Sequence, residues 1–186
     1  MTGEEATLGM ADALEVCDIP YILVGSFSSN FYGIGRSTKD ADFVIQLEGK
    51  SLSEITEYLG PAFKLDPQMS FETLTGTTRH IVNVEGSSFE IELFYLSADL
   101  HDQSRFERRQ QVKILGHLAY LPTAEDVIVT KLRWAKQGSR PKDKDDARNV
   151  IAVQAGRLDW DYIHRWCEAH GTRTLLDEIR ESLPPI

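Results

Sequence analysis

The sequence predicts a mixed α/β fold with a helical C-terminal part. Short apolar runs bounded by glycine, proline or polar residues recur through the first two thirds of the chain, which is typical of strands. Apolar residues at helical spacing occur at the start of the chain and between those runs. Beyond Pro122 the pattern is helical throughout. We therefore expect a mixed β-sheet core over residues 1–122, with residues 123–186 forming a helical region that packs on it.

The N-terminal elements follow from these patterns. Residues 4–17 have helical spacing of apolar side chains, and Pro20 separates this helix from the apolar run 21–24. Four apolar residues between proline and glycine predict a buried strand. A short helix or turn is expected to begin at Ser26, and a second strand over residues 42–47.

The middle of the chain predicts one helix and two hairpins. Residues 51–60 form a helix candidate, with Ser51 and Glu54 as a capping box. The hairpins are predicted where strand-like runs flank short turns, at residues 79–84 with 88–94 and at residues 112–115 with 118–121. After Pro122, helices are expected from Thr123 to about residue 137, over 143–154, from Asp159 to near Gly171, and over 172–182.

Composition limits the classes of function. The 186 residues are 41% hydrophobic and 26% charged, which is ordinary for a globular domain. Twenty Lys and Arg and 29 Asp and Glu give a formal net charge of 20 − 29 = −9. Nonspecific electrostatic binding of nucleic acid over the whole protein surface is therefore disfavoured. A local basic patch stays open.

The surroundings of the protein are predicted from three features. The acidic start Met-Thr-Gly-Glu-Glu differs from a signal peptide, and no apolar run approaches the roughly 20 residues that span a bilayer. Cys17 and Cys167 have neither metal-site spacing nor a disulfide pattern. We expect a cytoplasmic protein with no membrane segment.

Residues 25–42 contain a pattern that predicts a binding site for phosphate and a divalent metal. Gly25 and Ser26 follow a strand and open a helix, which exposes backbone N–H groups at the positive helix end, a suitable place for a triphosphate. Asp40 and Asp42 begin the next strand, where a period of two places both carboxylates on one face. Paired carboxylates repel each other unless a cation joins them, and Mg²⁺ prefers such oxygens together with phosphate oxygens.

A third carboxylate comes from residues 89–94, Phe-Glu-Ile-Glu-Leu-Phe. On a strand, Ile91 and Leu93 take one face, and Glu90 and Glu92 share the other. The Ile-Glu-Leu-Phe context favours Glu92, and Glu90 replaces it if the register differs by two residues.

Together these residues resemble the nucleotidyltransferase superfamily with the polymerase-beta-like fold. The matches are Gly25-Ser26, Asp40-Ala41-Asp42 and Glu92, where the family more often has aspartate as its third acid. The stretch from Arg36 to Asp42 is similar to the Arg-x-Thr-x-Asp-x-Asp form of small bacterial nucleotidyltransferases of the abortive-infection toxin type. Further matches are Pro122 with Asp126, Lys131, and the segment Arg140-Pro-Lys142-Asp143-Lys-Asp-Asp146.

The resemblance implies a nucleotidyltransferase fold and the transfer of a nucleoside monophosphate from an NTP to an acceptor hydroxyl. It implies Mg²⁺ or Mn²⁺ held by Asp40, Asp42 and Glu92, which are also the catalytic residues, with Glu92 able to take the acceptor's proton. The residues that it implies for nucleotide binding are Gly25, Ser26, Arg36, Lys131, Arg140 and Lys142. The acceptor is unassigned: a protein, a tRNA and a small molecule all fit.

Other interpretations are open for the same residues. The two aspartates could be a solvated turn that leads into a strand. The cations of residues 140–148 could be an ordinary solvated helix start. At the level of function, the alternatives are a catalytically degenerate nucleotidyltransferase fold that binds a nucleotide or a partner protein, and a purely structural component of a toxin–antitoxin pair.

Overall fold

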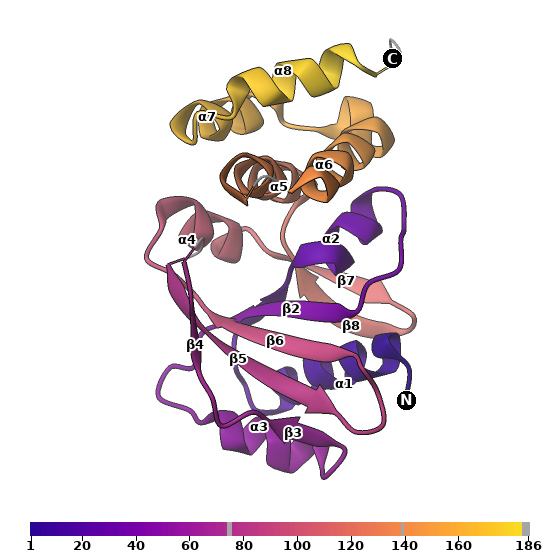
Figure 1. Cartoon of the computed structure of the whole chain (residues 1–186), viewed down its shortest axis with the longest axis vertical. Coiled ribbons are helices and arrows are strands. Elements are labelled where there is room, and N and C mark those ends of the chain that lie inside the picture. The colour runs from indigo at the N-terminus through magenta and orange to yellow at the C-terminus, as the bar shows by residue number, and fades with distance from the viewer. Residues whose placement is uncertain (74–75, 139, 184–186) are drawn as a thin grey trace. The chain divides into compact units, whose positions relative to one another are not determined.

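The computed structural model of the chain describes residues 1–73, 76–138 and 140–183. Its internal contacts divide it into two compact units (Figure 1). The first consists of Met1–Phe27 and Ser37–Pro122, and the second of Ser28–Arg36 and Thr123–Ile186. The predicted mixed α/β fold with a helical C-terminal part is confirmed. The segment 28–36, which precedes the two aspartates in the sequence, packs with the helical unit.

A mixed sheet forms the centre of the first unit. Within the described residues its strands are β1 (Tyr21–Leu23), β2 (Asp40–Ile45), β3 (Phe63–Leu65), β4 (Ser70–Glu72), β5 (Thr77–Val84) and β6 (Glu90–Tyr95). The order is β1-β2-β6-β5-β3, and β4 also pairs with β5. The pair β2–β6 is parallel and the other neighbours are antiparallel. The starts of β2 and β6, which carry the predicted acids, therefore lie side by side.

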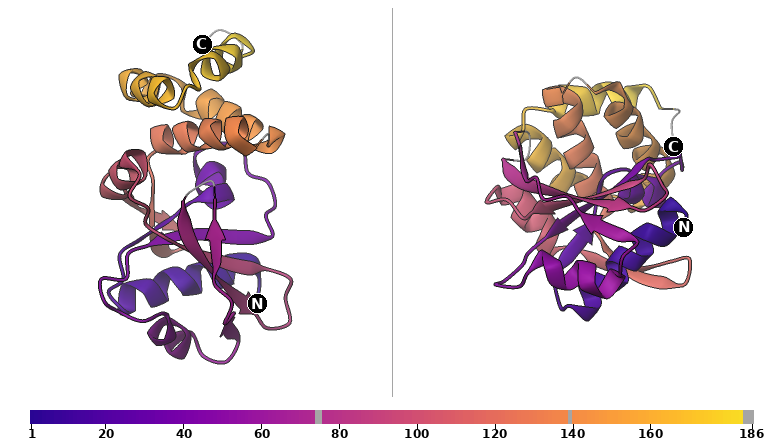
Figure 2. Two further views of the ribbon diagram at one scale, coloured as in Figure 1. Left: turned by 60° about the vertical axis from the view of Figure 1, so that its left-hand side comes forward. Right: turned by 60° about the horizontal axis from the view of Figure 1, so that its bottom comes forward.

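Period-two alternation decides what the two faces of β2 and β6 carry. Ala41, Phe43, Ile91 and Leu93 are almost fully buried on one face. Helix α1 (Gly3–Val16) packs against α3 (Leu52–Leu59) and contacts β2 (Figure 2). Burial of the apolar alternate residues fixes the strands, so the acids that alternate with them must occupy the other face.

Helix starts in this unit follow their sequence signals. The predicted capping box of α3 is present, since Ser51 and Glu54 satisfy each other's backbone N–H groups. Thr2 and Glu5 form a second capping box at α1. Helix α2 (Gly25–Tyr32) begins directly after β1, and the hairpin of β7 (Gln110–Ile114) and β8 (His117–Leu121) forms where it was predicted.

The second unit is helical. Its elements are α5 (Ala124–Gly138), α6 (Pro141–Gln154), the 3-10 turn η1 (Ala155–Arg157), α7 (Trp160–Ala169) and α8 (Arg173–Glu181). Helix α5 packs against α6 and α7, and α8 packs against α6 and α7. The segment 28–36 joins this unit by close backbone contact. A Cβ atom at Gly33 would lie 3.1 Å from the backbone nitrogen of Val150, and Gln154 Nε2 donates to the carbonyl of Tyr32 at 2.7 Å.

Three elements of the first unit have no counterpart in the sequence predictions. Strands β3 and β4 have three residues each, too few for a period of two to be visible. Helix α4 (Leu100–Glu107) is polar along most of its length, although Asp99 caps it by accepting from the backbone N–H groups of His101 and Asp102. Contacts within the folded unit, and not local patterns, specify these elements.

Candidate functional site

The register of β2 and β6 brings the predicted acids into one row. Asp42 lies opposite Glu92, and Asp40 lies opposite Glu90. Register partners in a parallel pair project to the same side of the sheet, so the four carboxylates share the face that the apolar residues leave. Asp40, Asp42 and Glu92 are partly buried, and Glu90 is exposed. Four like charges on neighbouring side chains repel one another, so this face favours a bound cation.

Gly25 allows the Asp42 carboxylate to lie against the first turn of α2. Gly25 has φ +60°, in the left-handed region, and a Cβ atom at this position would be 1.8 Å from Asp42 Oδ2. The strands hold this arrangement, since Val24 N donates to the Asp42 carbonyl at 2.8 Å. Ser26, the next residue of α2, is buried. A metal-ligand candidate and the positive end of a helix are thus adjacent.

Thr38 orients the other aspartate. Its hydroxyl Oγ1 donates to Asp40 Oδ1 at 2.7 Å. The hydrogen bond uses one carboxylate oxygen and fixes the direction of the other. The sequence analysis includes Thr38 only as part of a motif and gives it no role.

Glu92 is held by a cation that the sequence analysis did not single out. Arg79 Nη1 lies 3.2 Å from Glu92 Oε1 and 3.1 Å from Oε2, and the two side chains are 28% and 16% exposed. Burial raises the pKa of Glu92, and the charges of Asp40 and Glu90 raise it further. The contact with Arg79 lowers it without reversing the shift. The pairing of β5 with β6 places Ile81 opposite Glu92 and Arg79 two positions further along the same face, a register that the predicted hairpin alone does not give.

The remaining predicted residues belong to the helical unit, where three of them, Arg36, Lys131 and Arg140, form a network of ion pairs. Lys131 Nζ lies 2.8 Å from both Asp143 Oδ1 and Asp146 Oδ2. Arg36 donates from Nε and Nη2 to the two oxygens of Asp146, at 3.0 and 2.9 Å. Arg140 Nε lies 3.3 Å from Asp143 Oδ2. Lys131 is therefore buried among carboxylates.

Arg36, Arg140 and Lys142 keep contact with solvent, and the first two side chains are 35% and 36% exposed. The Arg140 guanidinium lies over the ring of Trp134, 5.0 Å from its centroid. Lys142 is exposed in the first turn of α6. The roles predicted for Arg36, Lys131, Arg140 and Lys142 in nucleotide binding stay predictions.

Comparison with known proteins identifies the architecture. No protein-family model and no curated protein matches the sequence. The chain is similar to the antibiotic-resistance factor ANT(2'')-Ia, with 13% identity, a TM-score of 0.60, and coverage of 97% of this chain and 98% of that one. It is similar to an antigenic nucleotidyltransferase-like protein from Paracoccidioides brasiliensis, with 19% identity, a TM-score of 0.55, and coverage of 99% and 94%. A candidate nucleotidyltransferase from H. pylori has 15% identity, a TM-score of 0.57, and coverage of 96% and 92%.

This chain has the nucleotidyltransferase fold. The resemblance inferred from Gly25-Ser26, the aspartate pair and the third acid is confirmed at the level of the fold. Within the ranges that the structure describes, no helix is both long enough and apolar enough to cross a membrane.

The acidic side chains at the candidate site have the ligand atoms, carboxylate oxygens, that a hard divalent ion prefers. Asp40 and Asp42 supply carboxylate oxygens from one face of β2, as Mg²⁺ and Mn²⁺ prefer. Glu92 is paired with Arg79 instead. Among the described residues, no group of three or more His, Cys, Asp or Glu side chains is arranged to hold a metal. Asp40 and Asp42 are therefore suitable metal ligands. Glu92 could become a third ligand only if its ion pair with Arg79 is broken or if one of its oxygens is released from it.

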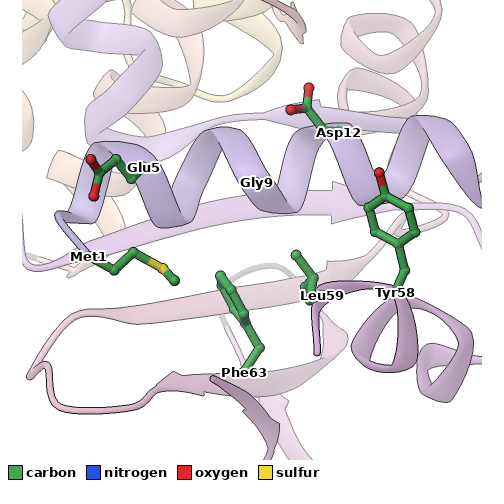
Figure 3. A pocket seen from close by; sticks show the side chains of 7 residues that line it. All are labelled: Met1, Glu5, Gly9, Asp12, Tyr58, Leu59 and Phe63. Carbon is green, nitrogen blue, oxygen red and sulfur yellow. The ribbon is translucent and has the colours of Figure 1, made fainter. Parts of the chain in front are cut away.

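A separate hollow of about 550 Å³ lies elsewhere in the first unit (Figure 3). Its lining comes from Met1, α1, α3 and β3, and includes Glu5, Asp12, Tyr58 and Phe63. None of the predicted site residues lines it.

Gly25→Ala should weaken both the fold and the candidate site. A side chain in the left-handed region costs roughly 1–2 kcal/mol, and the new Cβ would also displace the Asp42 carboxylate. Gly86→Ala is the matched control, because Gly86 also has positive φ, +72°, but nothing lies within 4 Å of its Cβ position. Urea unfolding should show a lower free energy of unfolding for both variants, because both place a side chain at positive φ. Calorimetry should show loss of Mg²⁺-ATP binding only in Gly25→Ala. Equal ATP affinity in the two variants would contradict the assignment.

Proposed function

We propose that this chain is a metal-dependent nucleotidyltransferase that transfers a nucleoside monophosphate from an NTP to an acceptor hydroxyl. The observation that carries the proposal is the position of Asp42, on the same strand face as Asp40 and against the first turn of α2. Metal ligands and an anion-binding helix start are thereby adjacent, as a metal–triphosphate substrate requires. The nucleotidyltransferase fold supports the same conclusion.

The candidate site residues of the first unit have distinct roles in this proposal. Asp40 and Asp42 would hold Mg²⁺ or Mn²⁺, and Thr38 keeps Asp40 oriented. The backbone N–H groups at Gly25 and Ser26 would bind the outer phosphates of the NTP. When bound, the metal supplies positive charge for the phosphate oxygens and lowers the pKa of the acceptor hydroxyl.

The transfer itself exchanges one bond for another. The acceptor oxygen forms a bond to the α-phosphorus as the bond from that phosphorus to the β-phosphate oxygen breaks, and pyrophosphate leaves. Glu92 would take the proton of the acceptor hydroxyl. The Glu92 carboxylate is paired with Arg79, so this role requires Glu92 to be released or shared.

One test decides whether transfer occurs. The protein is incubated with each labelled NTP, with Mg²⁺ or Mn²⁺ and with cell lysate, and the labelled species is identified. We expect metal-dependent label on one class of acceptor, and none with the Asp40→Asn/Asp42→Asn variant. The identity of the labelled species then assigns the acceptor as protein, tRNA or small molecule.

A binding module without turnover is the second candidate, and the Arg79–Glu92 pair favours it. A third acid that is neutralised by arginine and longer than aspartate is poorly placed to complete a catalytic shell. Nucleotide binding without incorporation of label, in a folded protein, would support this function over transfer.

Metal with nucleotide should also stabilise the fold. A ligand that binds only the folded state stabilises it by about 2.7 kcal/mol at 100 times its dissociation constant. We expect Mn²⁺ with a nonhydrolysable NTP to raise the melting temperature of the wild type. Asp40→Asn/Asp42→Asn should show no such increase. The same shift in both proteins would indicate a non-specific effect of the ion.

A further inference from the structure

Arg79 is fixed against Glu92 by contacts on two neighbouring strands. It lies on β5, between β4 and β6. Its Nη1 atom donates to both oxygens of Glu92 on β6, and its Nε atom donates to Ser70 Oγ on β4 at 3.2 Å. The hydrogen bond from Nε to Ser70 already restricts the guanidinium, so Arg79 loses less side-chain entropy when Nη1 holds the carboxylate. Arg79 is therefore preorganised for Glu92.

The row of acids explains what this cation does. Without it, Glu92 would add a partly buried charge beside Asp42, Asp40 and Glu90. Like charges on neighbouring side chains repel one another, and an adjacent guanidinium relieves that repulsion. A divalent ion would relieve it in the same way. Arg79 and a metal therefore offer Glu92 the same stabilisation.

We infer that Arg79 competes with a divalent metal for Glu92, so that Asp40 and Asp42 are available to the metal while the third carboxylate is held by the arginine. This inference rests on the proposed function, since it takes Asp40 and Asp42 as the metal ligands. The guanidinium and the divalent ion weaken each other's binding when both contact one carboxylate, because two cations repel each other at close range. Metal bound by Glu92 therefore requires Arg79 to give up at least one of the two oxygens that it now contacts.

Mn²⁺ binding in the absence of nucleotide tests the inference without relying on activity. Arg79→Gln removes the competing charge, so Mn²⁺ should bind more tightly. We expect a gain of roughly tenfold, which is the lower end of the size by which groups beside metal ligands change affinity, although loss of a supporting group acts in the opposite direction. Lys64→Gln is the matched control. It removes a cation from another strand of the same sheet, where Lys64 pairs with Glu85 in an exposed ion pair. Calorimetry, or the spin-resonance signal of free Mn²⁺, gives each dissociation constant.

A double variant shows whether the gain passes through Glu92. In Arg79→Gln/Glu92→Gln the tighter binding should disappear, because the carboxylate that Arg79 releases is absent. Mn²⁺ affinity of Arg79→Gln equal to that of Lys64→Gln would overturn the inference, as would a gain that persists in the double variant. Should Arg79→Gln fail to fold, Ser70→Ala takes its place. It removes the Nε anchor alone and should shift Mn²⁺ affinity in the same direction, whereas an unchanged affinity would count against the competition.

One further variant separates this inference from the proposed function. Asp42→Asn should abolish Mn²⁺ binding. If it does and Arg79→Gln gives no gain, the competition is wrong and the metal site stands. If Asp42→Asn leaves Mn²⁺ affinity unchanged, the metal site and the competition both fail.

Discussion

Asp42→Asn should reduce nucleotide transfer roughly a thousandfold, because a catalytic metal contributes several kcal/mol and each 1.36 kcal/mol is a factor of ten in rate. Asparagine keeps the shape of the side chain and its fit against Gly25, and removes only the charge. The fold should therefore persist while the metal is lost. Initial rates of label incorporation, measured at saturating Mn²⁺ and NTP, give the size of the effect.

Asp18→Asn is the matched control for this experiment. It makes the same chemical change at an exposed residue of the same unit, where Asp18 pairs with Lys50. Asp18 has φ +52°, a conformation that asparagine accepts, and an exposed ion pair contributes little. Its transfer rate should match the wild type. A similar rate in Asp42→Asn would remove Asp42 from the chemistry.

Lys131→Met should destabilise the fold by about 3 kcal/mol, the lower end of the range for a broken buried pair, because Asp143 and Asp146 lose their shared cation but keep their arginine partners. The side chains of Asp143 and Asp146 are 3% and 4% exposed, and Lys131 lies 2.8 Å from each. Methionine fills similar space, so the effect measures charge and not a cavity. Lys144→Met is the control, since Lys144 pairs with Glu178 at the surface and its loss should cost under about 1 kcal/mol. Equal urea midpoints for the two variants would contradict a buried, stabilising network.

The same network predicts a dependence of stability on pH. Burial opposes ionisation of Asp146, but the hydrogen bonds and charges of Arg36 and Lys131 outweigh it and hold the pKa of Asp146 below its usual value. Its ionised form therefore stabilises the fold above the unfolded pKa of about 3.9, and this stabilisation is lost as pH falls through the lower folded value. The difference in unfolding free energy between wild type and Asp146→Asn should be largest above about pH 5 and should shrink below about pH 4. A difference independent of pH would indicate that Asp146 acts through packing alone.

Local patterns in the sequence were sufficient for much of the fold. The capping box of Ser51 and Glu54 places the start of α3, because the two residues satisfy N–H groups within one turn. The alternation of Asp40 and Asp42 with Ala41 and Phe43 assigns each residue to a face of β2, because a strand has a period of two. Such interactions join residues only a few positions apart, so a single sequence can predict them.

Contacts between residues far apart in the sequence decided the rest of the candidate site. The pairing of β2 with β6 sets Glu92 opposite Asp42, and nothing near either residue specifies that register. Arg79 reaches Glu92 only because β5 lies between β4 and β6, and Lys131 is buried by Asp143 and Asp146 of a second helix. The sequence by itself thus determined which faces carry the acids and where helices with a clear cap, such as α3, begin. Only the tertiary structure decided which charges meet, because burial of the apolar face of each element fixes the register and the packing between elements.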